Sequence, residues 1–422
     1  MKVMGGNRGN RMKHLWMGCF AVVGVLLWGP CSGSAQQVAF GGIELASSSI
    51  KGITFVFQPG GEASGAGGER ADRMKRLQYA ERNASFVSMR DGCKLNARGV
   101  DLVVKDTLEV INELREGAKA KNLGELQLYG VGSSGLGSVC IKDEIVARVQ
   151  AEAGLCTEFI SASDEARYSL GFVLPKDRYR SLILDIGGGN VKAGYYVVTK
   201  GANWPPREWH GLEIGYGSRT LKDQALALMK TPQVDADGKA LPAMDFYQAV
   251  DAVLHKEVLP KIEEMKLENS AMENFSQVYM MGGVVWATST RTRPVQQQEW
   301  AINSIAKSDF DKMLAEIKDG SFSSFGGSEF GPHVSSKTKE GAENELQDVL
   351  QRFDAQSLYA GVSLVRYIIE QTMPTAHLYF PTTAAWISGY AREKFKETGR
   401  TVSACAVPAT QKQLSELHTA KP

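Results

Sequence analysis

The segment Ser181-Leu-Ile-Leu-Asp-Ile-Gly-Gly-Gly-Asn190 narrows sharply the folds available to this chain. An apolar run of strand character reaches one carboxylate, Asp185, and then three consecutive glycines. Glycine has no Cβ atom, so the backbone can turn sharply here and approach a ligand closely. Successive N–H groups in such a turn can form a concave anion site. The apolar residues 191–198 predict a return strand. The pattern therefore indicates a phosphate-binding hairpin, with an ordinary tight hairpin as the alternative.

Length, composition and charge are those of a soluble globular protein. The chain has 422 residues, of which 43% are hydrophobic and 23% are charged. This length is sufficient for two sizeable domains, and the composition is typical of globular proteins. The formal net charge of +1 gives no indication of a nucleic-acid partner.

The N-terminus has the pattern of an export signal. Lysine and arginine side chains precede an apolar core at residues 15–28, and the small residues Gly33-Ser34-Ala35 follow. This order predicts a signal peptide at residues 1–35, cleaved after Ala35, and a secreted or periplasmic protein. A membrane anchor is the alternative, but the apolar core is shorter than the roughly 20 residues that a span needs. We therefore expect no stable membrane anchor.

Four cysteines remain once the predicted signal is removed, namely Cys93, Cys140, Cys156 and Cys405. Disulfides form in an oxidising compartment, and four cysteines allow three pairings. Cys140 and Cys156 flank one predicted helix, so we favour a bond between them. The sequence has no CxxC spacing and no Cys/His cluster that would indicate zinc.

The rest of the chain alternates between strand and helix patterns, which predicts an α/β protein. Two Gly/Ser-rich segments, 58–68 and 319–343, are expected to be loops, the second either a substrate flap or plain disorder. Strands are expected at 50–57, 84–89, 126–131, 157–161, 209–215, 277–281 and 376–380. Helices are expected at 102–120, 142–153, 162–170 with Ser163 as N-cap, 219–229, 246–265, 308–317 and 356–371.

Polar or glycine-rich turns follow several of the expected strands. Hydroxyls and bare backbone amides at strand ends can bind phosphate without a metal. The alternative for the serines is simple turn formation. The residues predicted to bind phosphate on this ground are Ser47, Ser48, Ser49, Ser133, Ser134, Gly187, Gly188, Gly189, Gly282 and Gly283.

Two acidic residues are the candidate catalytic groups. Glu165 follows Ser163 and Asp164 at the start of an expected helix. The helix macrodipole stabilises an ionised carboxylate in the first turn, and such a carboxylate could deprotonate an attacking water. Asp185 could hold a cation or orient that water. The alternative is that Asp164 and Glu165 only complement the helix dipole.

The order of these motifs resembles the Ppx/GppA family of exopolyphosphatases and guanosine pentaphosphate phosphatases. The resemblance implies two actin-like domains of the ribonuclease H-like type with a cleft between them, at residues 36–170 and 171–400, followed by a tail at 401–422. It also implies that the family's catalytic acid falls on Glu165. The matching segments are 43–51, 129–136, 159–167, 184–189, 212–221, 280–284, 358–369 and 388–393, in that order.

Three positions depart from the family pattern. Glu44 stands where Asp is expected, Gly137 stands where Arg is expected, and Lys192 stands where Glu is expected. Lysine can neutralise phosphate as a point charge. Lys51 and Lys192 are therefore predicted to bind phosphate in place of metal and arginine, or else hydrolysis has been lost.

Two classes of function follow from these residues. The first is an exported phosphoanhydride hydrolase, either an exopolyphosphatase or a nucleotide phosphatase, in which Glu165 activates water and Asp185 holds Mg²⁺ or the water. The second is a catalytically impaired phosphate- or nucleotide-binding protein of the same fold. The expected partner is polyphosphate or a nucleotide rather than nucleic acid, and a homodimer is compatible with the sequence.

Overall fold

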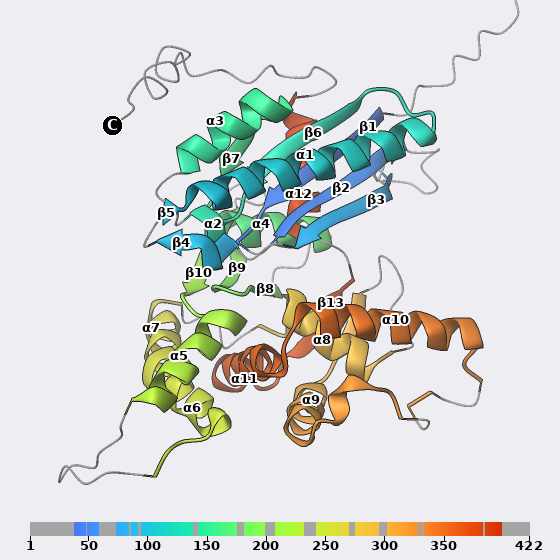
Figure 1. The fold of residues 1–422 in the computed structure, drawn as a ribbon. Coiled ribbons are helices and arrows are strands. Elements are labelled where there is room, and N and C mark those ends of the chain that lie inside the picture. Colours follow the sequence, from blue (N-terminus) through green and yellow to red (C-terminus); the bar gives the residue numbers. More distant parts are fainter. Residues whose placement is uncertain are drawn as a thin grey trace, which may run out of the picture. The chain divides into compact units, whose positions relative to one another are not determined.

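The computed structural model describes residues 38–47, 49–58, 73–83, 86–91, 94–137, 142–174, 181–198, 207–231, 242–269, 275–294, 302–326, 329–330, 333–382 and 385–398. These residues form two large mixed sheets, one of five strands and one of six, with helices packed on them (Figure 1). The predicted signal peptide and the tail at 401–422 lie outside the described residues. None of the helices in the described ranges is both long enough and apolar enough to cross a membrane.

The first sheet has the order β3-β2-β1-β6-β7. Strands β1 (Val38–Leu45), β2 (Ser49–Gln58) and β3 (Arg73–Asn83) are antiparallel, whereas β6 (Leu126–Gly132) and β7 (Thr157–Phe159) run parallel to β1 and to each other. Successive side chains of a strand point to opposite faces. On β1, Ile43 therefore packs with α1 (Ala97–Ala120) and α3 (Lys142–Ala153), and Phe40 packs with the other face.

The second sheet has the order β10-β9-β8-β11-β13-β12 and repeats this plan. Strands β8 (Ser181–Ile186), β9 (Val191–Val198) and β10 (Arg207–Ile214) are antiparallel, and β11 (Gln277–Met281) and β13 (His377–Pro381) are parallel to β8. Strand β12 (Ile302–Ile305) is added antiparallel to β13. The same order in both sheets, three antiparallel strands followed by two parallel ones, confirms the expected two-domain α/β architecture.

The helices that accompany the second sheet share one large apolar core with it. Leu182 on β8, Met280 on β11 and Leu364 on α11 are all fully buried in this core. These helices are α5 (Ser218–Lys230), α6 (Phe246–Val253), α7 (Leu259–Glu268), α8 (Gly283–Thr292), α9 (Lys307–Asp319), α10 (Ser336–Arg352) and α11 (Ala355–Thr372).

Two helices connect parts of the chain that are far apart in sequence. Helix α4 (Ala162–Val173) packs against α12 (Ala385–Thr398), and Tyr168 and Tyr390 meet edge to face. Helix α12 follows the last strand of the second sheet, yet it packs on β1 of the first sheet. The expected boundary at residue 170 falls inside α4, whose opposite side packs against Ile183 of β8.

Several expected elements differ in the structure. The third strand is β3 rather than 84–89, and Phe86–Met89 form a short 3-10 helix. The expected loop at 319–343 contains the start of α10, whose few buried residues, such as Ala342 and Leu346, are surrounded by a long polar face. Because so few positions of this helix are apolar, its sequence shows only a weak helical period. The expected helix 246–265 is interrupted by a π-helical turn, Leu254–Val258, next to Pro260. Proline has no N–H to donate, so regular α-helical bonding is lost there.

The predicted disulfide is only partly visible. Cys156 is disulfide-bonded. Cys140 lies outside the described residues, so its pairing with Cys156 stays a prediction.

Candidate phosphate site

Each sheet carries a lysine between two carboxylates on its three antiparallel strands. Residues that face each other across antiparallel strands have neighbouring side chains, and opposite charges there attract. The two hairpins thus repeat one charge pattern in the two halves of the molecule. The rows are Glu44, Lys51 and Glu81 on β1, β2 and β3, and Asp185, Lys192 and Glu213 on β8, β9 and β10.

The first pair joins Lys51 to Glu44. Lys51 Nζ lies 3.4 Å from Glu44 Oε2. Burial raises the pKa of the Glu44 carboxyl, although Lys51 opposes this shift. Burial would lower the pKa of Lys51, but Glu44 and Tyr79 raise it above its ordinary value. The Lys51 side chain stays 29% exposed.

Glu165 is held in the first turn of α4. Ser161 caps this helix, because its Oγ accepts the N–H of Asp164 at 3.0 Å. The expected cap, Ser163, instead accepts a hydrogen bond from Trp209 Nε1. Glu165 is 0% exposed. Its Oε1 accepts the N–H of Ser134 at 2.5 Å, and its Oε2 accepts from Lys192 Nζ. Both carboxylate oxygens therefore have a donor.

Lys192 connects this acid to the glycine-rich hairpin. Lys192 and Asp185 are both buried. Burial raises the pKa of Asp185, with Lys192 opposing the shift. Burial lowers the pKa of Lys192, but the nearby charges of Glu165 and Asp185 raise it to a net value above that of free lysine. The structure thus brings the two predicted catalytic acids to one buried ammonium group.

The glycine turn leaves two backbone amides for an anion. Gly187 donates its N–H to Asn190 O at 3.0 Å, and the carbonyls of Gly187 and Gly188 accept from the N–H groups of Ser218 and Arg219 at the start of α5. Within the described ranges, the N–H groups of Gly188 and Gly189 have no hydrogen-bond partner. A Cβ atom added at Gly189 would meet nothing within 4 Å. That these amides bind an anion stays a prediction.

Side chains join this hairpin to the other predicted turns. Asn190 Nδ2 donates to Glu213 Oε1 at 2.5 Å and approaches Ser134 Oγ at 3.5 Å. A Cβ atom added at Gly135 would lie 3.3 Å from Ser47 Oγ. The turns after β1, β6 and β8 are therefore neighbours in space.

Several other predicted phosphate ligands are buried or lie close to neighbouring groups. Ser49 and Ser133 are buried, and Ser48 is outside the described residues. Gly282 has a positive φ of 98°, and a Cβ atom there would lie 2.2 Å from Ile186 O. A Cβ atom at Gly283 would lie 2.6 Å from the Phe353 ring. Only glycine fits such close backbone approaches.

Two arginines near the site were missed by the sequence reasoning. The side chain of Arg219 lies against the glycine turn, since a Cβ atom at Gly188 would be 3.5 Å from Arg219 Cδ. Arg219 forms no ion pair with any carboxylate that the structure describes. The second arginine, Arg352 at the end of α10, pairs with Glu81 at 2.7 Å. The Gly-Ser-Arg step at residues 217–219, where α5 begins, was the available signal for Arg219.

Asp185, the predicted metal ligand, has a lysine beside it. Within the described part of the chain, no three His, Cys, Asp or Glu side chains gather as a metal site. The cross-strand neighbour of Asp185 is Lys192, whose ammonium already balances Asp185 and Glu165. The residues present therefore fit an internal ammonium here rather than an added divalent cation.

Solved structures identify the architecture. An exopolyphosphatase from Cytophaga hutchinsonii superposes with a TM-score of 0.57 at 14% identity, over 87% of this chain and 99% of the other. The chain has the fold of the Ppx/GppA proteins. A Ppx/GppA family member from Aquifex aeolicus superposes with a TM-score of 0.54 at 13% identity, over 86% of this chain and 100% of the other. No family model matches the sequence, and no curated protein is significantly similar to it.

Proposed function

We propose that this protein with the Ppx/GppA fold is an exported phosphoanhydride hydrolase that acts on polyphosphate or a nucleotide. The observation that carries the proposal is the position of Glu165, which is bonded to Lys192 of the glycine-rich hairpin and to the amide of Ser134. A carboxylate beside an anion site is the arrangement that a general base requires.

In this proposal, phosphate oxygens bind the amides of Gly188 and Gly189 together with Arg219 and Lys51. Lys192 transfers its hydrogen bond from Glu165 to a phosphate oxygen when the substrate enters. Glu165 Oε2 is then free to accept a proton from water. The water oxygen forms a bond to the terminal phosphorus, the P–O bond of the anhydride breaks, and its electron pair leaves with the shortened chain. Lys51, Lys192 and Arg219 balance the charge of the phosphates.

A second candidate function is supported by the same contact. Both oxygens of Glu165 are occupied, its side chain is 0% exposed, and one of its donors stands where the family pattern has Glu. A protein in which Lys192 never releases Glu165 would bind phosphates without hydrolysing them. This is the catalytically impaired phosphate- or nucleotide-binding protein.

Phosphate release separates the two functions. The purified protein is incubated with polyphosphate, ATP and guanosine tetraphosphate, each with Mg²⁺ and with a chelator, and binding is followed in parallel by calorimetry. Hydrolysis that is absent from Glu165→Gln supports the hydrolase. Binding without hydrolysis supports the second function. If the protein neither binds nor hydrolyses any of these compounds, both proposed functions are refuted.

Export is the remaining part of the proposal. Its support is the predicted signal at residues 1–35 together with the disulfide-bonded Cys156, because disulfides persist in oxidising compartments. N-terminal sequencing of the protein from the envelope or medium should give a start near Gln36. Mass mapping without reductant should give a Cys140–Cys156 peptide. Recovery of the chain with Met1 intact from that fraction would contradict export by a cleaved signal.

A further inference from the structure

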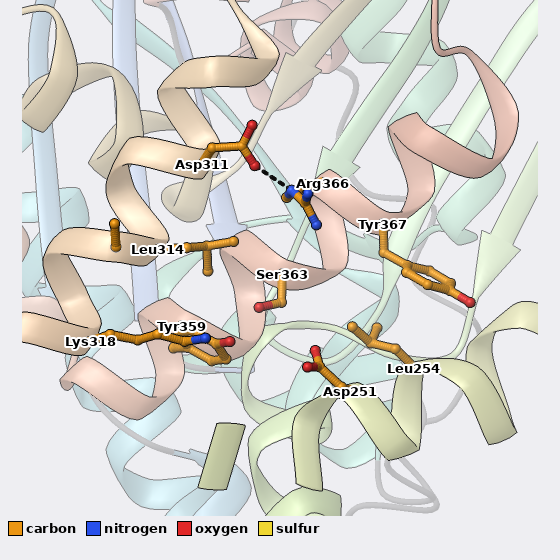
Figure 2. A pocket seen from close by; sticks show the side chains of 10 residues that line it. Asp251, Leu254, Asp311, Leu314, Lys318, Tyr359, Ser363, Arg366 and Tyr367 are labelled. Atoms are coloured by element: carbon orange, nitrogen blue, oxygen red, sulfur yellow. Dashed lines mark hydrogen bonds and ion pairs between the residues drawn. The ribbon is translucent and has the colours of Figure 1, made fainter. Parts of the chain in front are cut away.

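A cavity of about 350 Å³ lies among three helices of the second sheet (Figure 2). Its walls come from α6 and the following π turn, from α9 and from α11. None of these elements carries a residue of the two charge rows. The volume is at the lower end of the range for small-molecule sites. The cavity therefore has the size for a ligand of its own.

Two charged groups line this cavity without an ion-pair partner among the described residues. They are Lys318 on α9 and Asp251 on α6. The other charged groups of the wall are already balanced, because Arg366 pairs with Asp311 and with Glu370. Lys318 and Asp251 are both exposed and attract each other, so the wall offers one cation and one anion to a ligand.

The wall also holds Lys318 in place and presents a hydroxyl. Lys318 Nζ lies 5.1 Å from the ring centre of Tyr247 and 5.3 Å from that of Tyr359, which is cation–π geometry. A side-chain hydrogen bond with Tyr359 raises the pKa of Lys318, and the charge of Asp251 raises it further. Ser363 lines the same cavity (Figure 2), is 6% exposed, and its buried Oγ has no hydrogen-bond partner in the described structure. A buried hydroxyl without a partner is costly, and a ligand would remove that cost.

We propose that this cavity binds a small zwitterion, a free α-amino acid with an apolar side chain. The carboxylate pairs with Lys318, the ammonium pairs with Asp251, and Ser363 completes the polar contacts. The apolar side chain of the ligand packs on Leu254 and Leu314. A simple anion could pair only with Lys318, and a simple amine only with Asp251. This site does not depend on the proposed phosphate chemistry.

Calorimetry on the full chain tests the proposal with leucine and phenylalanine as probes. The controls are 4-methylpentanoate, which lacks the ammonium, isoamylamine, which lacks the carboxylate, and inorganic phosphate. We expect the amino acids to bind at least about tenfold more tightly than the controls. No binding of either amino acid, or equal binding of leucine and 4-methylpentanoate, would overturn the proposal without the use of any variant.

Variants then locate the site. Lys318→Met and Asp251→Asn should each weaken leucine binding by about tenfold or more. Ser363→Ala should weaken it less, because it removes one neutral hydrogen bond. Lys261→Met, at an exposed position on α7, should bind as the unmodified protein does. Unchanged affinity in both Lys318→Met and Asp251→Asn would place binding elsewhere and refute the assignment.

Discussion

Lys51 and Lys192 occupy equivalent positions in the two sheets. Each lies on the second strand of a β-hairpin, directly opposite the penultimate residue of the first strand, which is Glu44 in one sheet and Asp185 in the other. Each lysine also faces a carboxylate on the third strand. The repeated fold therefore carries a repeated charge pattern. Only Lys192 also bonds Glu165, so the symmetry is broken at the candidate base.

Glu165→Gln should lower turnover by about 10²- to 10⁴-fold, because general-base catalysis typically contributes that much. Ligand affinity should change little, since the amide keeps the shape and removes the proton acceptor. Steady-state phosphate release and calorimetry measure the two effects. Glu264→Gln, at an exposed position on α7, is the control. Equal turnover in Glu165→Gln and the unmodified protein would remove Glu165 from the mechanism.

Lys192→Glu should exchange an internal cation for a metal requirement. The variant gathers three carboxylates, at positions 165, 185 and 192, without their ammonium, and hard cations such as Mg²⁺ prefer such oxygen ligands. Phosphate affinity without metal should fall at least about tenfold. Thermal unfolding should respond to Mg²⁺ in the variant more than in the unmodified protein. If Mg²⁺ does not change the melting temperature of the variant, this role for Lys192 is contradicted.

Arg219→Ala should weaken binding of polyphosphate by about 1.5–3 kcal/mol, the usual range for a hydrogen bond to a charged group. The guanidinium lies beside the glycine turn and has no carboxylate partner among the described residues. The matched control is Arg115→Ala, at an exposed position on α1. If both variants lose affinity equally, Arg219 contributes only general positive charge and is not a phosphate ligand.

Stability should fall at alkaline pH through Lys192. The pKa of Lys192 is raised above its ordinary value of 10.5, because Glu165 and Asp185 outweigh the effect of burial. Below pH 10.5 its stabilising contribution is fully present. Above that pH the unfolded chain releases the proton that the folded protein keeps, so stability falls until the pH passes the folded pKa.

Lys192→Arg tests whether Lys192 causes this loss of stability, because arginine stays protonated in the folded and unfolded states at these pH values. Denaturant unfolding is measured from about pH 9 to about pH 11.5. In Lys192→Arg, the free energy of unfolding should fall with pH less steeply than in the unmodified protein, by up to about 1.4 kcal/mol per pH unit. Burial also raises the pKa of Tyr79, but that tyrosine contributes equally in both proteins. Lys337→Arg, at an exposed position on α10, should keep the original slope. If Lys192→Arg has the same pH slope as the unmodified protein, the pKa of Lys192 is no higher in the folded than in the unfolded state.

Arg352 and Glu81 should be energetically coupled. Arg352 Nη1 lies 2.7 Å from Glu81 Oε2, and the side chain of Glu81 is 7% exposed. A double-mutant cycle with Arg352→Gln and Glu81→Gln should give a coupling of about 0.5–3 kcal/mol in denaturant unfolding. The more exposed pair Arg148 and Asp101, 2.6 Å apart, should give under about 1 kcal/mol. Additive effects at Arg352 and Glu81 would show that the contact does not stabilise the protein.

Local sequence determined the hairpin of β8 and β9, most helices and the order of motifs. Three glycines after an apolar strand leave few backbone conformations, so the turn at Gly187 and the return strand β9 are predictable from neighbouring residues alone. Helix α11 follows equally from the spacing of its apolar residues. Helix α10 was not predicted, because it buries so few side chains that its helical period is weak.

Tertiary structure decided which charges meet. Glu165 and Lys192 are both visible in the sequence, but only the packing of α4 against β9 brings the ammonium to the carboxylate. The register of β1 with β2 and of β8 with β9 likewise sets each lysine opposite an acid, and one residue of slip would turn it to the other face. Helix α12 returns to β1 by burying Trp386 and Tyr390 against Phe40. Local patterns specify turns and periodicity, whereas contacts between residues far apart in sequence arise only when the apolar faces of the elements are buried together.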